Sequence, residues 1–310
     1  MRFTDVNNLR VSIYATMAYF DIFEFPLKIA ELEQFLLWAS VDKRTLWDFL
    51  NNDPGIQRHG EFYFFKGRRE IVDKRKMKEQ VAAGLWRKVR FFIPLLKLVP
   101  YVRMVAVCNS LAINNTDAES DIDLFIIAKK GRLFTARTLV TFLFALLGLR
   151  RHGKKAKGRF CLSFFISDDA LCLKNIKDGE DDIYLPYWIL SLKPIFGVDV
   201  FNSFIASNAW IKNYFPSRQL NGFVSSKDGG ILKSIAGLKE KILNGSIGDT
   251  LEKFLATKHL QRFKLRLATL GPHASVVVNE KMLKFHNIDR RKEIAKKFAA
   301  RFEELTRLSA

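Results

Sequence analysis

VCNSLAINNTDAESDIDLFII, residues 107–127, places two aspartates one residue apart at the start of an apolar run. Successive side chains of a β-strand point to opposite faces of a sheet. Asp121 and Asp123 therefore share one side of the expected strand, and apolar side chains occupy the other. This pattern raises the question of why two acids stand side by side in a segment that is otherwise being buried.

A bound cation is the simplest physical answer. Two carboxylates this close repel each other and raise a pKa unless a cation lies between them. Mg²⁺ takes oxygen ligands, commonly one or two carboxylates together with substrate phosphates. Two such ions can activate an attacking hydroxyl and stabilise a leaving phosphate. The pair thus predicts a metal clamp at Asp121 and Asp123. The alternative is that both acids lie at the solvent edge of a strand and bind nothing.

The residues before the acids favour the metal interpretation. An apolar strand ends at Cys108, a polar turn of Asn109 and Ser110 follows, and Asp121 comes eleven residues after Ser110. This arrangement resembles the nucleotidyltransferase superfamily typified by DNA polymerase beta, over roughly residues 88–170. The resemblance implies that Asp121 and Asp123 hold Mg²⁺, with two ions in an active enzyme. It also implies that Ser110, with the Asn109 backbone, binds the triphosphate of an NTP substrate.

Two departures from the family pattern bear on activity. Asn109 stands where the family has glycine, which allows φ > 0 and close approach of a phosphate. Asparagine is the next best residue for that conformation. The third family carboxylate belongs on a later strand, here RFCLSFFIS at 159–167, which carries Ser163 but no acid. The enzyme is therefore expected to be slow, to use Asp168 just past that strand as a third catalytic acid, or to be inactive.

The rest of the chain predicts an α+β fold, with a small mixed-sheet nucleotidyltransferase core between an N-terminal winged-helix-like unit and C-terminal helices. Three stretches resemble bacterial nucleotidyltransferase-domain proteins with an N-terminal winged helix: TMAYFDIFEFPLKIAEL, SDIDLFIIAKKGRLFTART and LKFHNIDRR. The expected parts are a winged-helix-like domain at 1–66, a connecting basic helix at 67–98, the core at 99–180 and a helical C-terminal region at 181–310. Pro94 is expected to kink or restart the connecting helix.

The net charge of +19 over 310 residues favours polyanionic partners, although a basic surface that binds nothing explains it equally well. The loop RRHGKKAKGR at 150–159 carries six Lys or Arg among ten residues. Lys154 and Lys155 in this loop, and Arg137 on the helix that follows the second core strand, are candidate ligands of a triphosphate or an RNA backbone. The alternatives are a solvated loop for the lysines and pairing with an acid for Arg137. The cluster from His286 to Arg291 either serves a substrate or caps a helix.

Two functions follow as hypotheses. The first is Mg²⁺-dependent transfer of an NMP from an NTP to a hydroxyl acceptor on RNA, a protein or a small molecule. The second is an inactive nucleotidyltransferase-fold protein that binds nucleic acid or a nucleotide. Three cysteines without metal-like spacing, and no apolar run of membrane-spanning length, lead us to expect a cytoplasmic protein without a membrane partner.

Overall fold

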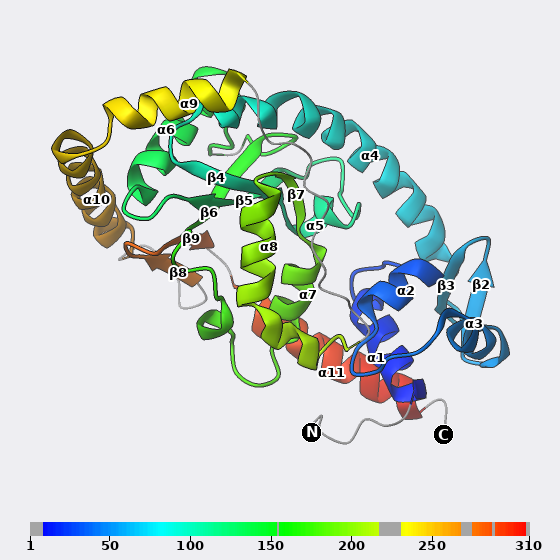
Figure 1. The fold of residues 1–310 in the computed structure, drawn as a ribbon. Coiled ribbons are helices and arrows are strands. Elements are labelled where there is room, and N and C mark those ends of the chain that lie inside the picture. The colour runs from blue at the N-terminus through cyan, green and yellow to red at the C-terminus, as the bar shows by residue number, and fades with distance from the viewer. Residues whose placement is uncertain (1–8, 154, 217–230, 268–274, 287–288, 308–310) are drawn as a thin grey trace.

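A computed structural model describes residues 9–153, 155–216, 231–267, 275–286 and 289–307. It is a mixed α/β structure with a three-stranded sheet near the N-terminus and a six-stranded mixed sheet at the centre (Figure 1). Lys154 lies outside the described residues. Among the described residues, no helix is both long enough and apolar enough to cross a membrane.

The N-terminal unit consists of three helices and a small antiparallel sheet. The helices are α1 (Leu9–Asp21), α2 (Ile29–Phe35) and α3 (Lys43–Asn52), and the strands are β1 (Leu27–Lys28), β2 (Ile56–His59) and β3 (Phe62–Phe65). The Asp42 carboxylate caps α3 by accepting the backbone N–H groups of Arg44 and Thr45 at 3.0 Å, as expected for an aspartate at this position. Strand β3 is central, and its four side chains are buried.

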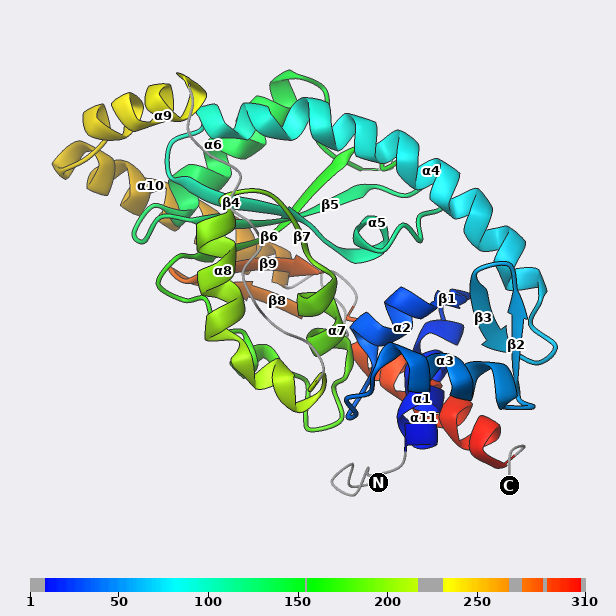
Figure 2. The same cartoon turned by 45° about the vertical axis from the view of Figure 1, so that its right-hand side comes forward.

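A long helix, α4 (Glu70–Phe92), leads from this unit to the central sheet (Figure 2). It ends where Pro94 enters a 3₁₀ helix, η1 (Ile93–Leu98), because proline cannot supply the next helical N–H group. Arg75 ties α4 to the N-terminal unit. Its side chain is 2% exposed, its guanidinium pairs with Glu31 at 2.7 Å, and it donates to the Pro26 carbonyl.

The central sheet has the strand order β7-β4-β5-β6-β9-β8. Its strands are β4 (Val102–Val107), β5 (Ile122–Ala128), β6 (Phe160–Ser167), β7 (Lys193–Phe196), β8 (Ser275–Val278) and β9 (Met282–His286). Strands β5 and β6 are parallel and all the other pairs are antiparallel. The short helix α5 (Asn109–Ala112) follows β4, and α6 (Leu133–Leu146) joins β5 to β6.

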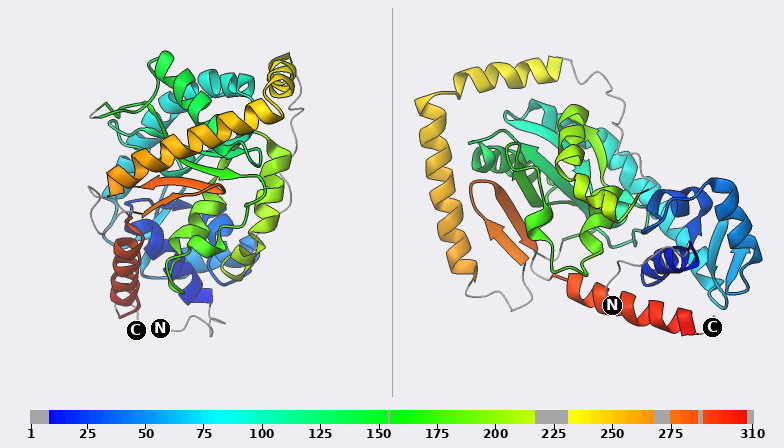
Figure 3. Two further views of the ribbon diagram at one scale, coloured as in Figure 1. Left: turned by 90° about the vertical axis from the view of Figure 1, so that its left-hand side faces the viewer. Right: turned by 60° about the horizontal axis from the view of Figure 1, so that its bottom comes forward.

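Helices cover both faces of this sheet, because alternate side chains of each strand are apolar on both sides. One face packs against α4, η1 and α6. The other packs against α7 (Tyr184–Ser191) and α8 (Val198–Ser207). Helices α9 (Ile231–Ile242) and α10 (Ser246–Leu267) lie outside the first layer (Figure 3), with α9 against η1 and α10 against α6.

The expectation of a helical C-terminal region holds only in part, because three strands of the central sheet also come from it. Strand β7 lies at one edge of the sheet, where Pro194 is tolerated because it need not donate a hydrogen bond to a second neighbour. Strands β8 and β9 form a hairpin that pairs with β6 at the other side. The last helix, α11 (Arg291–Arg307), runs from this hairpin to the N-terminal unit (Figure 3).

The N-terminal unit shares its core with distant parts of the chain. Apolar side chains of α1, α2, α3, α7 and α11 form one buried cluster. Within it, the rings of Tyr19 and Tyr187 stack with centroids 4.0 Å apart. Arg301 of α11 also pairs with Asp21 of α1 at 2.7 Å. The four-part division of the chain remains a prediction, and these contacts show that its first and last parts pack on each other.

Candidate metal and nucleotide site

The turn after β4 is held by the side chain of Asn109. Asn109 has φ +58°, in the left-handed region. Its side-chain N–H donates to the Asp123 carboxylate at 2.8 Å, and its side-chain oxygen accepts the indole N–H of Trp188 at 2.9 Å. Asn109 therefore adopts a backbone conformation that glycine reaches most easily. Its side chain also links Asp123 of β5 to Trp188 of α7.

The two aspartates stand where β5 begins, next to the end of β4. Asp121 accepts a charged hydrogen bond from Arg151 at 2.6 Å. Removal from bulk water, reinforced by the negative charge of Asp121, raises the pKa of Asp123 to about 6, although the Asn109 amide opposes the shift. The expected repulsion between the carboxylates is thus present and only partly relieved by these neighbours.

The neighbouring strand adds a sulfur atom to this pair. Strand β6 runs parallel to β5, and its Cys161 stands opposite Asp123. The ligand atoms of Asp121, Asp123 and Cys161 all lie within 4.8 Å of one another. Burial raises the pKa of the Cys161 thiol to about 12. Cys161 is a site residue that the sequence analysis missed, because its place beside Asp123 depends on strand pairing.

These three side chains line a cavity of about 1070 Å³. Strands β5, β6 and β9 contribute Asp123, Cys161 and Lys284 to it, and α7 contributes Trp188. The charged side chains in the lining are six Lys or Arg and three aspartates: Arg137, Arg150, Arg151, Lys284, Arg290, Arg291, Asp121, Asp123 and Asp289. This excess of positive charge suits an anionic ligand.

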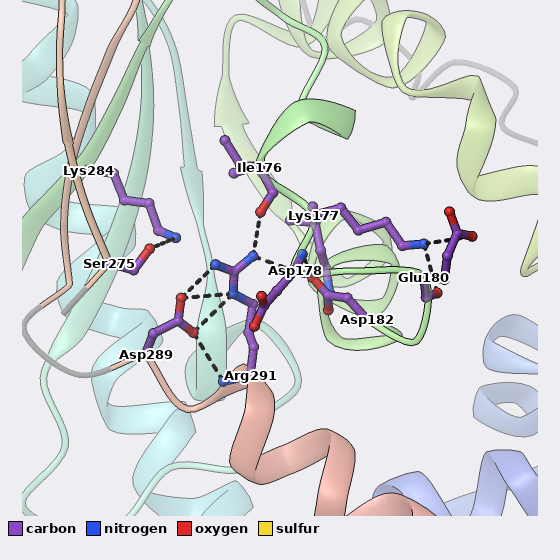
Figure 4. A network of polar contacts seen from close by, with 10 residues as sticks. Ile176, Lys177, Asp178, Glu180, Asp182, Ser275, Lys284, Asp289 and Arg291 are labelled. Atoms are coloured by element: carbon purple, nitrogen blue, oxygen red, sulfur yellow. Dashed lines mark hydrogen bonds and ion pairs between the residues drawn. The ribbon is translucent and has the colours of Figure 1, made fainter. Parts of the chain in front are cut away.

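The cluster before α11 forms a polar network (Figure 4), and its residues Asp289 and Arg291 belong to the cavity lining. Arg291 donates to Asp289 at 2.6 Å, pairs with Asp182 at 3.4 Å and donates to the Ile176 carbonyl. The Asp289 carboxylate also accepts the backbone N–H of Arg291 at 3.1 Å, at the start of the helix. The two interpretations of this cluster are therefore compatible, since the same residues begin α11 and line the cavity. The side chain of His286 lies outside the described residues.

Lys284 is the most buried cation of the lining, with 5% of its surface exposed. Its ammonium group donates to the Ser275 hydroxyl at 2.7 Å (Figure 4). Burial, aided by the positive charge of Arg291, lowers the pKa of Lys284 to about 8. Local sequence patterns did not single out this residue, because it reaches the cavity only through the pairing of β9 with β6.

Two other predicted ligands, Ser110 and Arg137, line different pockets. Ser110 lines a smaller, mostly aromatic pocket of about 160 Å³ that shares Asn109 and Trp188 with the main cavity. Arg137 lines the main cavity, donates to the Leu162 carbonyl at 2.9 Å and lies over the Phe285 ring.

The basic loop reaches the cavity through its first residues only. Arg150, Arg151 and His152 line the cavity. Lys155 is exposed and is not part of the lining. The prediction that Lys155 binds the nucleotide therefore has no support from its position. Arg150 and Arg151 are closer candidates in the same basic run.

Asp168 does not join the site, contrary to expectation. It follows the last residue of β6, whereas Asp121 precedes the first residue of the parallel strand β5. The length of a strand, roughly 20 Å, separates the two ends. The Asp168 carboxylate instead accepts the backbone N–H of Lys130 at 2.8 Å. The prediction that Asp168 is a third catalytic acid is therefore wrong.

The donor set fits one Mg²⁺ ion better than two. Two neighbouring carboxylates facing a cavity, with room for phosphate oxygens, are a common Mg²⁺ arrangement. A second hard ion would need a further carboxylate, but the third ligand atom beside Asp121 and Asp123 is the Cys161 sulfur. Thiol sulfur is a poor ligand for Mg²⁺.

The chain was compared with protein-family models, curated proteins and solved structures. None of the three comparisons gave a match. The case for a function therefore rests on the sequence motif and on the geometry of this cavity.

Proposed function

We propose that this protein is a metal-dependent nucleotidyltransferase that moves an NMP from an NTP to a hydroxyl acceptor. The observation that carries the proposal is the meeting of the Asn109 turn with Asp121 and Asp123 in a cavity whose lining is rich in cations. A triphosphate bound with a divalent ion needs both features, because carboxylates hold the metal and cations balance the phosphate charge. The N-terminal helices and hairpin would then be a winged-helix unit, and the central sheet a nucleotidyltransferase core.

Each part of the cavity has a role in this proposal. Asp121 and Asp123 would hold a divalent metal ion, which would neutralise charge on the phosphates. Ser110 and the Asn109 backbone, at the start of α5, bind the triphosphate where the smaller pocket adjoins the main cavity. The acceptor oxygen forms a bond to the α-phosphorus while the bond to the β-phosphate oxygen breaks, so pyrophosphate leaves and the acceptor proton passes to solvent. Arg150 and Arg151 attract the anionic substrates to the open side.

A second candidate is a protein of the same fold that binds a nucleotide or nucleic acid without catalysis. It is favoured by one observation, namely that Cys161 stands opposite Asp123 and no acid lies on β6. In the family that the motif resembles, the acid of that strand helps deprotonate the acceptor. The basic helix α4 and the N-terminal unit would contact the nucleic acid in this case.

The test is calorimetric titration of each NTP in the presence of Mg²⁺ or Mn²⁺. We expect metal-dependent binding by the wild type and loss of that binding in Asp121→Ala. Asp168→Ala is the matched control, because it removes an aspartate at the far end of the same strand pair and should bind as the wild type does. Labelled NTP and candidate acceptors then separate the two functions. Failure of every NTP to bind would overturn both nucleotide proposals.

A further inference from the structure

Asp121, Asp123 and Cys161 form a mixed set of two carboxylates and one thiol. Two strands fix this set, since Asp123 and Cys161 are paired residues of β5 and β6 and their ligand atoms lie within 4.8 Å of those of Asp121. The set faces the main cavity, where other ligand atoms have room to approach. Three protein ligands and one open position are typical of catalytic metal centres that bind borderline ions such as Zn²⁺.

A cation already lies against this set. One guanidinium nitrogen of Arg151 is 2.6 Å from an Asp121 oxygen and 3.9 Å from the Cys161 sulfur. The Arg151 side chain is 47% exposed and comes from a loop, so it can leave without disturbing the sheet. The guanidinium thus marks the place where a positive charge is stabilised, and a metal ion entering the set would replace it.

The chemistry of the three donors decides which metal fits. Mg²⁺ prefers oxygen ligands, whereas thiolate ligands favour softer ions such as Zn²⁺ and Co²⁺. We propose that Asp121, Asp123 and Cys161 form a metal site that selects a thiophilic divalent ion over Mg²⁺. The inference rests on the proposed function for what the metal does there, but metal binding itself needs neither a nucleotide nor catalysis.

The first test is titration of the full chain with Co²⁺, followed by absorption spectroscopy. A Co²⁺ ion bound to a thiolate gives a sulfur-to-metal band in the near ultraviolet, and carboxylates alone do not. We expect this band in the wild type and its loss in Cys161→Ser, with Co²⁺ affinity at least about tenfold lower, since even second-shell changes commonly cost that much. Cys172→Ser is the control, because it removes the exposed thiol and should leave the band unchanged.

A measurement on the unaltered protein guards against a variant that fails to fold. Zn²⁺ should slow alkylation of Cys161 by iodoacetamide, as followed by mass spectrometry of the peptide that contains it. Mg²⁺ at the same concentration should not. Equal rates with and without Zn²⁺, or a cobalt band that persists in Cys161→Ser, would overturn the proposal.

Cys161→Asp tests the selectivity in the opposite direction. This change places a carboxylate on β6, the strand on which the resembling family carries its third acid, so the preference should shift from Zn²⁺ towards Mg²⁺ and Mn²⁺. Two failures can then be told apart. A cobalt band without binding of any NTP would retain the metal site and reject the proposed function. NTP binding with Mg²⁺ that survives Cys161→Ser, without a cobalt band in the wild type, would retain the proposed function and reject the thiophilic metal site.

Discussion

Asn109 shows how one residue can satisfy both a backbone and a side-chain requirement. Its left-handed backbone turns the chain after β4, and its amide joins Asp123 to Trp188. Glycine would meet the first requirement and leave the indole N–H without its acceptor. Asparagine at this position thus supplies two hydrogen bonds that glycine could not make.

Substitutions of Asn109 separate these two contributions. Asn109→Gly keeps the backbone and loses both hydrogen bonds, so we expect the free energy of unfolding to fall by about 1–3 kcal/mol. In Asn109→Ala the free energy of unfolding should fall by about 1–2 kcal/mol more than in Asn109→Gly, because a Cβ atom disfavours φ > 0. Urea denaturation measures both values. Asn114 also has φ +58°, so the Gly-to-Ala difference there should be similar. Equal stabilities of Asn109→Gly and Asn109→Ala would contradict this account.

Local pattern was enough to predict the two carboxylates but not their partners. Asp121 and Asp123 follow from alternation within one strand, which is a local property of the sequence. Cys161 and Lys284 reach the cavity through strand pairs that join distant segments. Periodicity carries no information about which strands become neighbours, so a single sequence did not reveal these two residues. The prediction of Asp168 as a third catalytic acid failed for the same reason. Its distance from Asp121 and Asp123 depends on the direction in which β6 runs beside β5.

At the scale of elements, the long segments were predictable and the short strands of the C-terminal region were not. Strands β4 to β6 and helices α4 and α6 have apolar patterns long enough to identify. Strands β7 and β9 have four and five residues and become strands only through pairing with β4 and β6. Tertiary contacts therefore decide their conformation, as is common for short apolar segments.

The contact between α10 and α6 is expected to weaken in acid. His259 of α10 lies 3.1 Å from the Thr138 hydroxyl of α6, and burial, followed by the charges of Arg137 and Arg262, lowers its pKa to about 4. The unfolded chain has the ordinary histidine pKa near 6.5 and binds a proton first. The stability that neutral His259 contributes is thus complete above about pH 6.5 and lost as the pH falls towards 4.

His259→Gln tests this expectation, because glutamine can still bond Thr138 but does not titrate. The free energy of unfolding is measured from pH 7 to pH 4 for both proteins. We expect the wild type to lose more stability than the variant over this range. Parallel pH profiles would show that His259 is not linked to folding.

At the scale of the whole molecule, α11 connects the cavity to the N-terminal unit. Its first residue, Arg291, lines the cavity, and its later residues Phe298 and Phe302 are buried in the cluster that contains α1. Arg301 adds an ion pair to Asp21 of α1. An event at the N-terminal unit, such as contact with a nucleic acid, would therefore act on a helix whose other end lines the cavity.

Because α1 and α11 share a core, we expect the N-terminal unit to lose protection from hydrogen exchange when the packing of α11 is weakened. Phe298 is 3% exposed, and Phe298→Ala should lower the free energy of unfolding by about 3–5 kcal/mol, because it removes a buried ring and leaves a cavity. Hydrogen exchange should then accelerate in α1 as well as in α11, while β4 and β5 change less. Lys297→Ala is the control on an exposed neighbour and should stay within about 0.5 kcal/mol of the wild type. Faster exchange in α11 with unchanged protection in α1 would show that residues 1–66 fold independently, as the four-part division of the sequence implies.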